Sequence, residues 1–280
     1  MEKRIVKITS ITKKLLVALF ATFLLLFLLF HMTANLFILL HDDGAAYSAF
    51  CHFMGSNPIV KVFEVGLLAI FLLHICLASW LWYTNRKARP VRYHQPTKSR
   101  TGKGSKLAMI TGSLLLVCLI FHFYDFFFVK LNFVEGSYMT KSEELMSAAM
   151  MQEGEGYADD EMLLATLFDA DHLSQDMKWV KNINADQRRQ LEALYPTLEV
   201  EPDFYIMARQ KFSIWHIVLG YLIFFAVVGI HIRHGFEAAF QTFGLNHHKY
   251  ARLVEVLGII YCWVVCTGFA IVPIGVFFGL

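Results

Sequence analysis

Charged residues are scarce in this chain. Only 17% of its 280 residues are charged, 56% are hydrophobic, and the mean hydropathy is +0.49. A single soluble core of this size does not need so much apolar surface. The composition therefore argues against a soluble domain and indicates a membrane protein.

Cysteine is also sparse, and its spacing excludes paired-thiol motifs. None of the cysteines forms a C-x-x-C pair, so we interpret them as free thiols packed among helices. They are Cys51, Cys76, Cys118, Cys262 and Cys266.

Five apolar segments are long enough to cross a membrane, because a helix needs about 20 residues to span a hydrocarbon core of about 30 Å. The first begins too far into the chain, and runs too long, for a cleavable signal peptide. The segments are 14–40, 59–83, 106–130, 212–236 and 251–278.

The predicted fold is an all-α integral membrane protein with five transmembrane helices, four of which form an up-down bundle. Membrane helices occupy 1–133 and 206–280, and an acidic, mostly helical insertion occupies 134–205.

The net charge of +2 hides an asymmetry that predicts the topology. Residues 135–206 carry 16 acidic and 5 basic side chains, whereas the rest of the chain carries 7 acidic and 20 basic ones. Basic loops favour the cytoplasm. The N-terminus and the loops after the second and fourth spans are basic, so we expect them inside, with the insertion and the C-terminus outside.

The insertion carries two sequence signals for helix starts. Thr140-Lys-Ser-Glu143 and Asn184-Ala-Asp-Gln187 both resemble capping boxes, and Pro196 is expected to end the second helix. A small helical cap is predicted, with disorder of the Gly-rich residues 153–156 as the alternative. We assign no chemistry to it.

Four spans each place a histidine deep in the membrane, where a polar side chain is costly and usually faces a partner, a cavity or a cofactor. His31 and His122 lie about 24 Å from the cytoplasmic start of their helices. His74 and His231 lie about 22 to 28 Å from the outer start of theirs. The four therefore form two layers, and in an up-down bundle each layer is one diagonal pair of helices.

Paired imidazoles across a bundle can bind both axial positions of a haem iron, which suits electron transfer because no open position is left. The layers predict two bis-histidine haems b, with irons about 15 Å apart. Helix-packing histidines or a proton relay are the alternatives. Because the four histidines fall into two matched layers, we favour the haem interpretation over these alternatives.

Three further side chains lie near the inner layer. His234, one turn beyond His231, competes for the ligand role or contacts a haem propionate. Arg86 and Arg233 could pair with the propionates of the inner haem, or they are ordinary positive-inside residues. Gly235 leaves room for a porphyrin, although helix packing explains it equally well.

Several motifs along the spans resemble a known family. They are Leu28-Leu-Phe-His31-Met32, Ser56-Asn-Pro58, Phe71-Leu-Leu-His74, Asn85 to Tyr93, Thr111-Gly112, Gly229 to Phe236 and Ala239 to Asn246. Together they are similar to the di-haem cytochrome b membrane-anchor subunit of succinate:quinone oxidoreductases. That family includes succinate dehydrogenase and fumarate reductase, and the resemblance is to its single-chain, five-helix form. It covers the five spans and leaves out the insertion.

The resemblance implies that His74 and His231 hold the proximal haem and that His31 and His122 hold the distal one. It also implies a flavoprotein subunit with FAD and the dicarboxylate site, and an iron–sulfur subunit on the basic face. The chain would be the quinone-reactive subunit of a respiratory enzyme in the bacterial inner membrane. Menaquinone is the expected quinone, a dimer of complexes is an option, and no nucleic-acid partner is expected.

The quinone site stays open among the polar residues of the first outer loop. Tyr47 and His52 offer hydrogen bonds to a quinone oxygen, although interfacial anchoring explains either equally well. The other candidates are His41, Asp42 and Asp43. Some members of the family carry a glutamate where this chain has Gly229, so a proton route through that position is not expected.

Two other functions compete with this interpretation. A cytochrome b that anchors another membrane dehydrogenase would share the haems but lack the motifs at 85–93 and 241–246. A haem-free proton-conducting transporter would use the histidines as a relay and would show no haem absorption.

Overall fold

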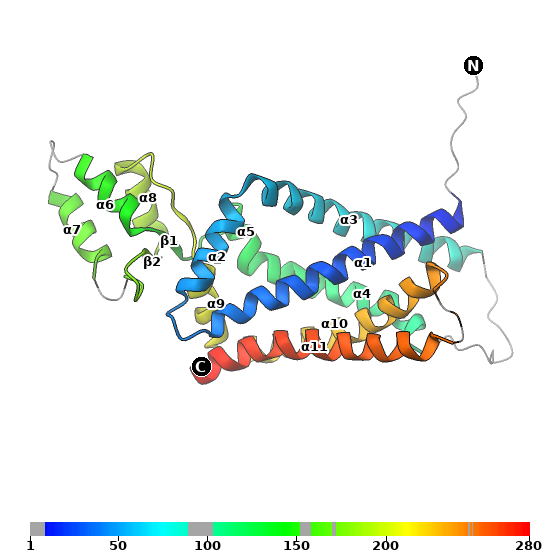
Figure 1. The fold of residues 1–280 in the computed structure, drawn as a ribbon. Coiled ribbons are helices and arrows are strands. Elements are labelled where there is room, and N and C mark those ends of the chain that lie inside the picture. Colours follow the sequence, from blue (N-terminus) through cyan, green and yellow to red (C-terminus); the bar gives the residue numbers. More distant parts are fainter. Residues whose placement is uncertain (1–8, 89–102, 152–157, 170–171, 246, 248) are drawn as a thin grey trace, which may run out of the picture. The chain divides into compact units, whose positions relative to one another are not determined.

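The computed structural model describes residues 9–88, 103–151, 158–169, 172–245, 247 and 249–280, with the side chains of 103–106 and 158–161 excepted (Figure 1). Parts of four predictions lie outside the described residues. They are the basic N-terminal residues 1–8, the basic loop beyond residue 88, the Gly-rich residues 153–156, and Asn246.

Five helices among the described residues are long and apolar enough to cross a membrane, as predicted. They define a multi-pass membrane protein. The helices are α1 (Ser10–Asn35), α3 (Pro58–Lys87), α4 (Lys103–His122), α10 (Trp215–Thr242) and α11 (Ala251–Phe278). A 3₁₀ turn, η1 (Leu36–Leu39), extends α1. A π-helical turn, η2 (Phe123–Phe127), joins α4 to α5 (Phe128–Lys130).

The fourth span begins later than predicted. A separate helix, α9 (Phe204–Phe212), ends before a turn in which Ser213 Oγ donates to the carbonyl of Gln210. The revised start at Trp215 places His231 as far along α10 as His74 lies along α3, about 24 Å from each helix start.

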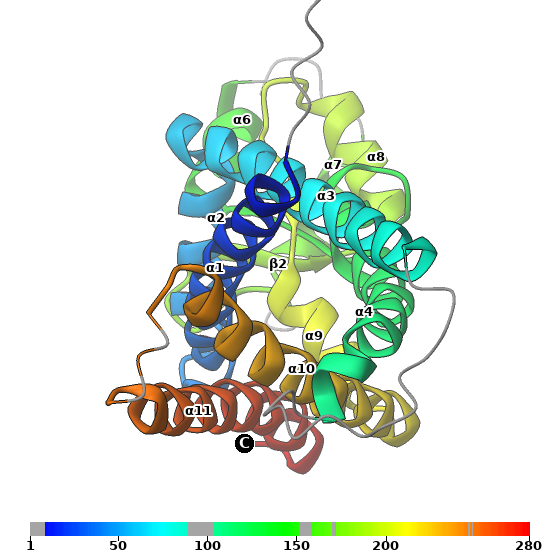
Figure 2. The same cartoon turned by 90° about the vertical axis from the view of Figure 1, so that its right-hand side faces the viewer.

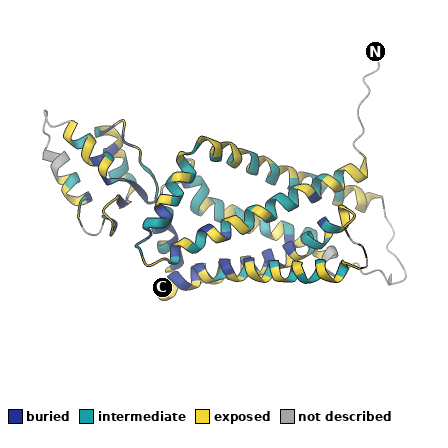
Figure 3. Ribbon diagram, in the orientation of Figure 1, coloured by how far each residue is buried: buried dark blue, intermediate teal, exposed yellow. Residues whose placement is uncertain are grey.

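Helix α3 contains no buried residue, and its surface is a mixture of exposed and half-buried side chains (Figure 3). In water such an apolar surface would be unfavourable. Lipid covers these side chains in a membrane, so the burial pattern of α3 agrees with its assignment as a span.

The chain divides into two compact units. The first comprises Met1–Thr33, Pro58–Leu116 and Ile223–Phe269, and the second comprises Ala34–Asn57, Val117–Leu222 and Ala270–Leu280.

In the first unit, α10 packs against α11 at Gly229. A Cβ atom at this position would lie 3.0 Å from Cys266 Sγ and 3.3 Å from Cys262 Sγ. Both thiols donate to carbonyls of α10, at 3.3 Å to Gly229 and 3.5 Å to Phe225. The prediction that the cysteines are free is confirmed, and these two act as small packing groups between helices, whereas Cys76 is exposed and not packed as predicted.

The second unit contains the insertion, which combines helices with a small sheet that was not predicted (Figure 2). The antiparallel strands lie in the order β2 (Trp179–Ile183), β1 (Tyr138–Lys141), β3 (Glu201–Pro202). Helices α6 (Ser142–Met151), α7 (Ala158–Leu167) and α8 (Ala185–Leu194) bury Leu145, Leu167 and Leu191 in the same core as Val180 and Ile183.

The two predicted capping boxes have different outcomes. The box at Asn184 and Gln187 is confirmed, because each residue's side chain accepts the backbone N–H of the other at 2.9 Å, and α8 ends before Pro196. The box at Thr140 is wrong. Thr140 lies in β1, and its hydroxyl donates to the carbonyl of Glu199 at 2.8 Å.

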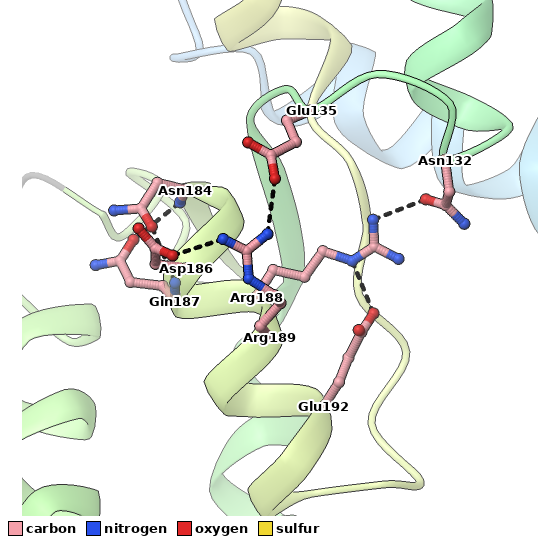
Figure 4. A network of polar contacts seen from close by, with 8 residues as sticks. All are labelled: Asn132, Glu135, Asn184, Asp186, Gln187, Arg188, Arg189 and Glu192. Atoms are coloured by element: carbon pink, nitrogen blue, oxygen red, sulfur yellow. Dashed lines mark hydrogen bonds and ion pairs between the residues drawn. The ribbon is translucent and has the colours of Figure 1, made fainter.

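Arg188 of α8 connects the insertion to the residues that follow the third span, and the neighbouring Arg189 pairs with the first residues of the insertion (Figure 4). Arg188 donates to Asn132 Oδ1 and Arg189 donates to Glu135 Oε1, both at 2.7 Å. On α8 itself, the two arginines pair with Glu192 and Asp186.

Helix α2 (Ala45–Ser56) packs on α9 at the start of the first outer loop. Gly44 adopts φ +74°, and a Cβ atom there would collide with the ring of Tyr205. The ammonium group of Lys181 donates to the carbonyl of Asp43 and lies over the same ring. These contacts fix the loop on the insertion.

Candidate functional site

The first unit brings His74 of α3 and His231 of α10 into one region. The imidazole of His231 lies within electrostatic range of the imidazoles of His74 and His234. Both His74 and His231 are half-buried. This is the pair predicted for the inner layer.

Thr111 of α4 contacts His231 directly. Thr111 Oγ1 lies 3.1 Å from His231 Nδ1, and its hydroxyl proton points to the carbonyl oxygens of Leu107 and Ala108, at 3.1 and 3.2 Å. With the hydroxyl donating to the backbone, its oxygen is available to accept from His231 Nδ1–H, and the backbone of Ala108 is a second hydrogen-bond partner of this ring. The lone pair of His231 is then on Nε2, which is the form of imidazole that binds a metal.

Gly112 makes room for the same ring. A Cβ atom at Gly112 would lie 3.2 Å from His231 Cε1, closer than most side-chain contacts. Thr111 therefore orients the imidazole and Gly112 lets it approach α4.

His74 has a buried nitrogen that the described residues leave unsatisfied. Its Nδ1 is inaccessible and makes no hydrogen bond of normal geometry among them, whereas the imidazole has a backbone hydrogen-bond contact with Val17. A buried polar atom without a partner is unfavourable by about 1 to 3 kcal/mol.

His122 belongs to the second unit, where a chain of polar side chains holds it. Its Nδ1 lies 3.4 Å from the hydroxyl oxygen of Tyr221, and Tyr221 donates to Asp125 Oδ2 at 3.4 Å. Asp125 Oδ1 in turn accepts from Lys211 Nζ at 2.6 Å. The sequence analysis missed Asp125, Tyr221 and Lys211. An aspartate inside the third predicted span was the available signal.

His31 lies in the first unit among aromatic rings. It stacks on Phe27 with ring centroids 5.3 Å apart, and Phe269 lies at 5.7 Å. Its predicted partner His122 belongs to the second unit.

The candidate propionate contacts have other neighbours. Arg233 is exposed and lies 3.9 Å from Glu237, and Arg86 is exposed with its guanidinium 5.3 Å from the ring of Trp82. His234 is half-buried. A Cβ atom at Gly235 would meet no described atom within 4 Å, so packing does not require a glycine there.

The residues predicted for quinone binding lie in the second unit and face the insertion. His52 Nδ1 pairs with Glu201 Oε1 at 2.9 Å, and its ring meets the edge of Trp179 at 5.4 Å. Burial raises the pKa of Glu201. Tyr47 is buried, its hydroxyl donates to Asn35 Oδ1 at 3.4 Å, and burial raises its pKa.

The remaining loop candidates differ in exposure. Asp42 accepts from the backbone of Gly44 and Ala46 at the start of α2, Asp43 is half-buried, and His41 is exposed. Of the candidates, His41 is therefore the most accessible.

The described residues contain no group of three or more histidine, cysteine, aspartate or glutamate side chains placed to hold a metal ion. A haem iron needs only two protein ligands, so this finding concerns free ions alone. No match to the chain was found among protein-family models, curated proteins or solved structures.

Proposed function

We propose that the chain is the haem b-containing membrane anchor of a succinate dehydrogenase or fumarate reductase. In this role it passes electrons between an iron–sulfur subunit and a membrane quinone. The observation that carries the proposal is the state of the inner histidine pair. Thr111 Oγ1 lies 3.1 Å from His231 Nδ1, on the side of the ring away from Nε2, and the imidazole of His74 lies within electrostatic range of the same ring.

His74 and His231 would hold the inner haem, Thr111 would keep the His231 ring in place, and Gly112 would provide space beside it. A bound haem supplies one-electron transfer. The chain's own residues would hold and orient the group, and its apolar helices would exclude water from it.

The outer pair would be His31 and His122, with the aromatic rings of Phe27 and Phe269 beside the first. Ring faces of this kind provide an apolar, rigid wall. Menaquinone would react near this outer haem. Iron–sulfur and flavoprotein subunits, which carry the clusters, FAD and the dicarboxylate site, would bind the basic face in the bacterial inner membrane.

A reduction experiment tests the proposal as a whole. The chain is purified from its native membranes with its partners, succinate is added, and the α-band of b-type haem is followed. We expect succinate to reduce haem and a menaquinone analogue to reoxidise it.

The alternatives predict different spectra. A haem that dithionite reduces but that neither succinate nor quinol reduces would mean that the chain anchors another dehydrogenase. A pure and folded chain without a Soret band would favour the haem-free transporter.

A further inference from the structure

The third span contains an acidic side chain that the proposed electron path does not use. Asp125 lies in the π-helical turn η2, and its side chain is only 14% exposed. A carboxylate is costly in a span even when it is paired, and π turns often occur at functional sites. The residue therefore needs an explanation.

The hydrogen bonds around Asp125 have a defined direction. A carboxylate can only accept, so the hydroxyl proton of Tyr221 points to Asp125. The hydroxyl oxygen of Tyr221 is then an acceptor for His122 Nδ1–H. This places the lone pair of His122 on Nε2. Thr111 favours the same form at His231, because its hydroxyl donates to backbone carbonyls and leaves the oxygen to accept.

The two arrangements differ in charge. The acceptor behind His231 is a neutral threonine, whereas the tyrosine behind His122 is hydrogen-bonded to a carboxylate. Hydrogen bonding of this kind makes an imidazole a stronger electron donor to its metal. Lys211, which is 36% exposed on α9, pairs with the carboxylate at 2.6 Å and offsets part of its charge.

We propose that Asp125 and Tyr221 are positioning residues that hold His122 in its iron-binding form and lower the reduction potential of the outer haem, an inference that rests on the proposed function. Lys211 opposes this effect because its positive charge partly cancels that of Asp125. The inner haem has no corresponding charged chain among the described residues near Thr111 and His231.

Redox titration of single variants in the purified complex tests this inference. The outer haem is the component that His31→Ala removes. Asp125→Asn and Tyr221→Phe should each raise its midpoint potential. At a fixed ambient potential the reduced-to-oxidised ratio should rise about tenfold, or about 59 mV for one electron. Lys211→Met should shift the same component downward. The inner component should stay unchanged in all three.

Opposite shifts separate charge from structural damage, because a loosened helix contact would not reverse sign between Asp125→Asn and Lys211→Met. The matched control is Tyr124→Phe, which removes an exposed phenol from the same π turn and should change nothing. Asp125→Glu should restore the wild-type potential. Low-spin electron paramagnetic resonance of the outer haem should shift with Tyr221→Phe.

The possible negative results distinguish failure of this inference from failure of the proposed function. If Asp125→Asn loses the outer haem altogether, Tyr221→Phe decides, since it removes one oxygen and keeps the ring. Unchanged potentials and spectra in Tyr221→Phe, or equal shifts of both haems, would overturn the inference and leave the haem proposal intact. A wild-type chain without low-spin haem would overturn the proposed function instead.

Discussion

Thr111 Oγ1 lies 3.1 Å from Nδ1 of His231, and the threonine proton is directed to its own helix backbone. Thr111→Val keeps the shape of the side chain and removes the acceptor. We expect the inner haem to remain bound and its midpoint potential to rise by roughly 40 mV, the equivalent of about 1 kcal/mol for one hydrogen bond. Redox titration of the purified complex measures the midpoint potential of the inner haem.

Thr111→Ser is the control, because serine retains the acceptor and should keep the wild-type potential. An inner-haem potential that does not respond to Thr111→Val would mean that the threonine only packs against the ring. The outer haem should be unaffected by either change.

The four intramembrane histidines should act as two independent pairs. His74→Ala and His231→Ala should each remove the inner low-spin component, and His31→Ala and His122→Ala should each remove the outer one. The loss of one axial nitrogen leaves the iron five-coordinate or weakly water-ligated. Optical and paramagnetic resonance spectra of the purified variants show which component is lost.

His234→Ala is the matched control one turn along the same helix, and it should retain both low-spin signals. Loss of the inner haem in His234→Ala but not in His231→Ala would show that the ligand had been misassigned by one turn. Loss of the same component in His31→Ala and His74→Ala would contradict the layered arrangement.

Asp203 gives the insertion a pH-dependent stability. It caps α9, accepts from Ile206 N at 3.0 Å, and is fully buried beside Lys181. Burial raises its pKa from 3.8 to about 6. Between these values the folded chain holds a proton that the unfolded chain has lost. Stability is therefore full below about pH 4 and falls by roughly 3 kcal/mol as the pH rises to about 6.

Asp203→Asn isolates this effect, since an amide keeps the capping oxygen and does not titrate. Thermal unfolding of both proteins at pH 4 to 7 gives the difference in their stabilities, in which the other titrating groups cancel. The wild-type stability should decline relative to Asp203→Asn over this interval. A constant difference would show that burial does not perturb the carboxyl.

The charge asymmetry predicts that the insertion faces the outside. Gln175 is exposed in the insertion, and Lys87 is exposed at the end of α3. In intact cells, an impermeant thiol reagent should label Gln175→Cys above the background of the parent chain and should label Lys87→Cys only after lysis. The reverse pattern would overturn the topology, and with it the assignment of inner and outer haems.

The sequence predicts the spans well because a membrane imposes a length and a composition that single segments reveal. The capping box at Asn184 is equally local, and it too is confirmed. The sheet was missed because β1 has four residues and β3 two, which is too short for a clear alternation. Its stability comes from pairing between distant segments.

The polar chain behind His122 escaped prediction for a similar reason. Lys211 and Tyr221 lie far from Asp125 in the sequence and meet it only in the folded protein. Gly229 is a comparable case. From sequence it marked a departure from a family pattern, whereas the structure gives it a packing role against Cys262 and Cys266.

The most direct test of this account is the haem content of the purified wild-type chain, measured by pyridine haemochrome together with a reduced-minus-oxidised spectrum. We expect two haems b for each chain, both low-spin and hexacoordinate. His216→Ala is a suitable reference variant, because His216 is exposed at the start of α10 and its loss should leave this number unchanged. A folded wild-type chain that carries no haem would contradict the account.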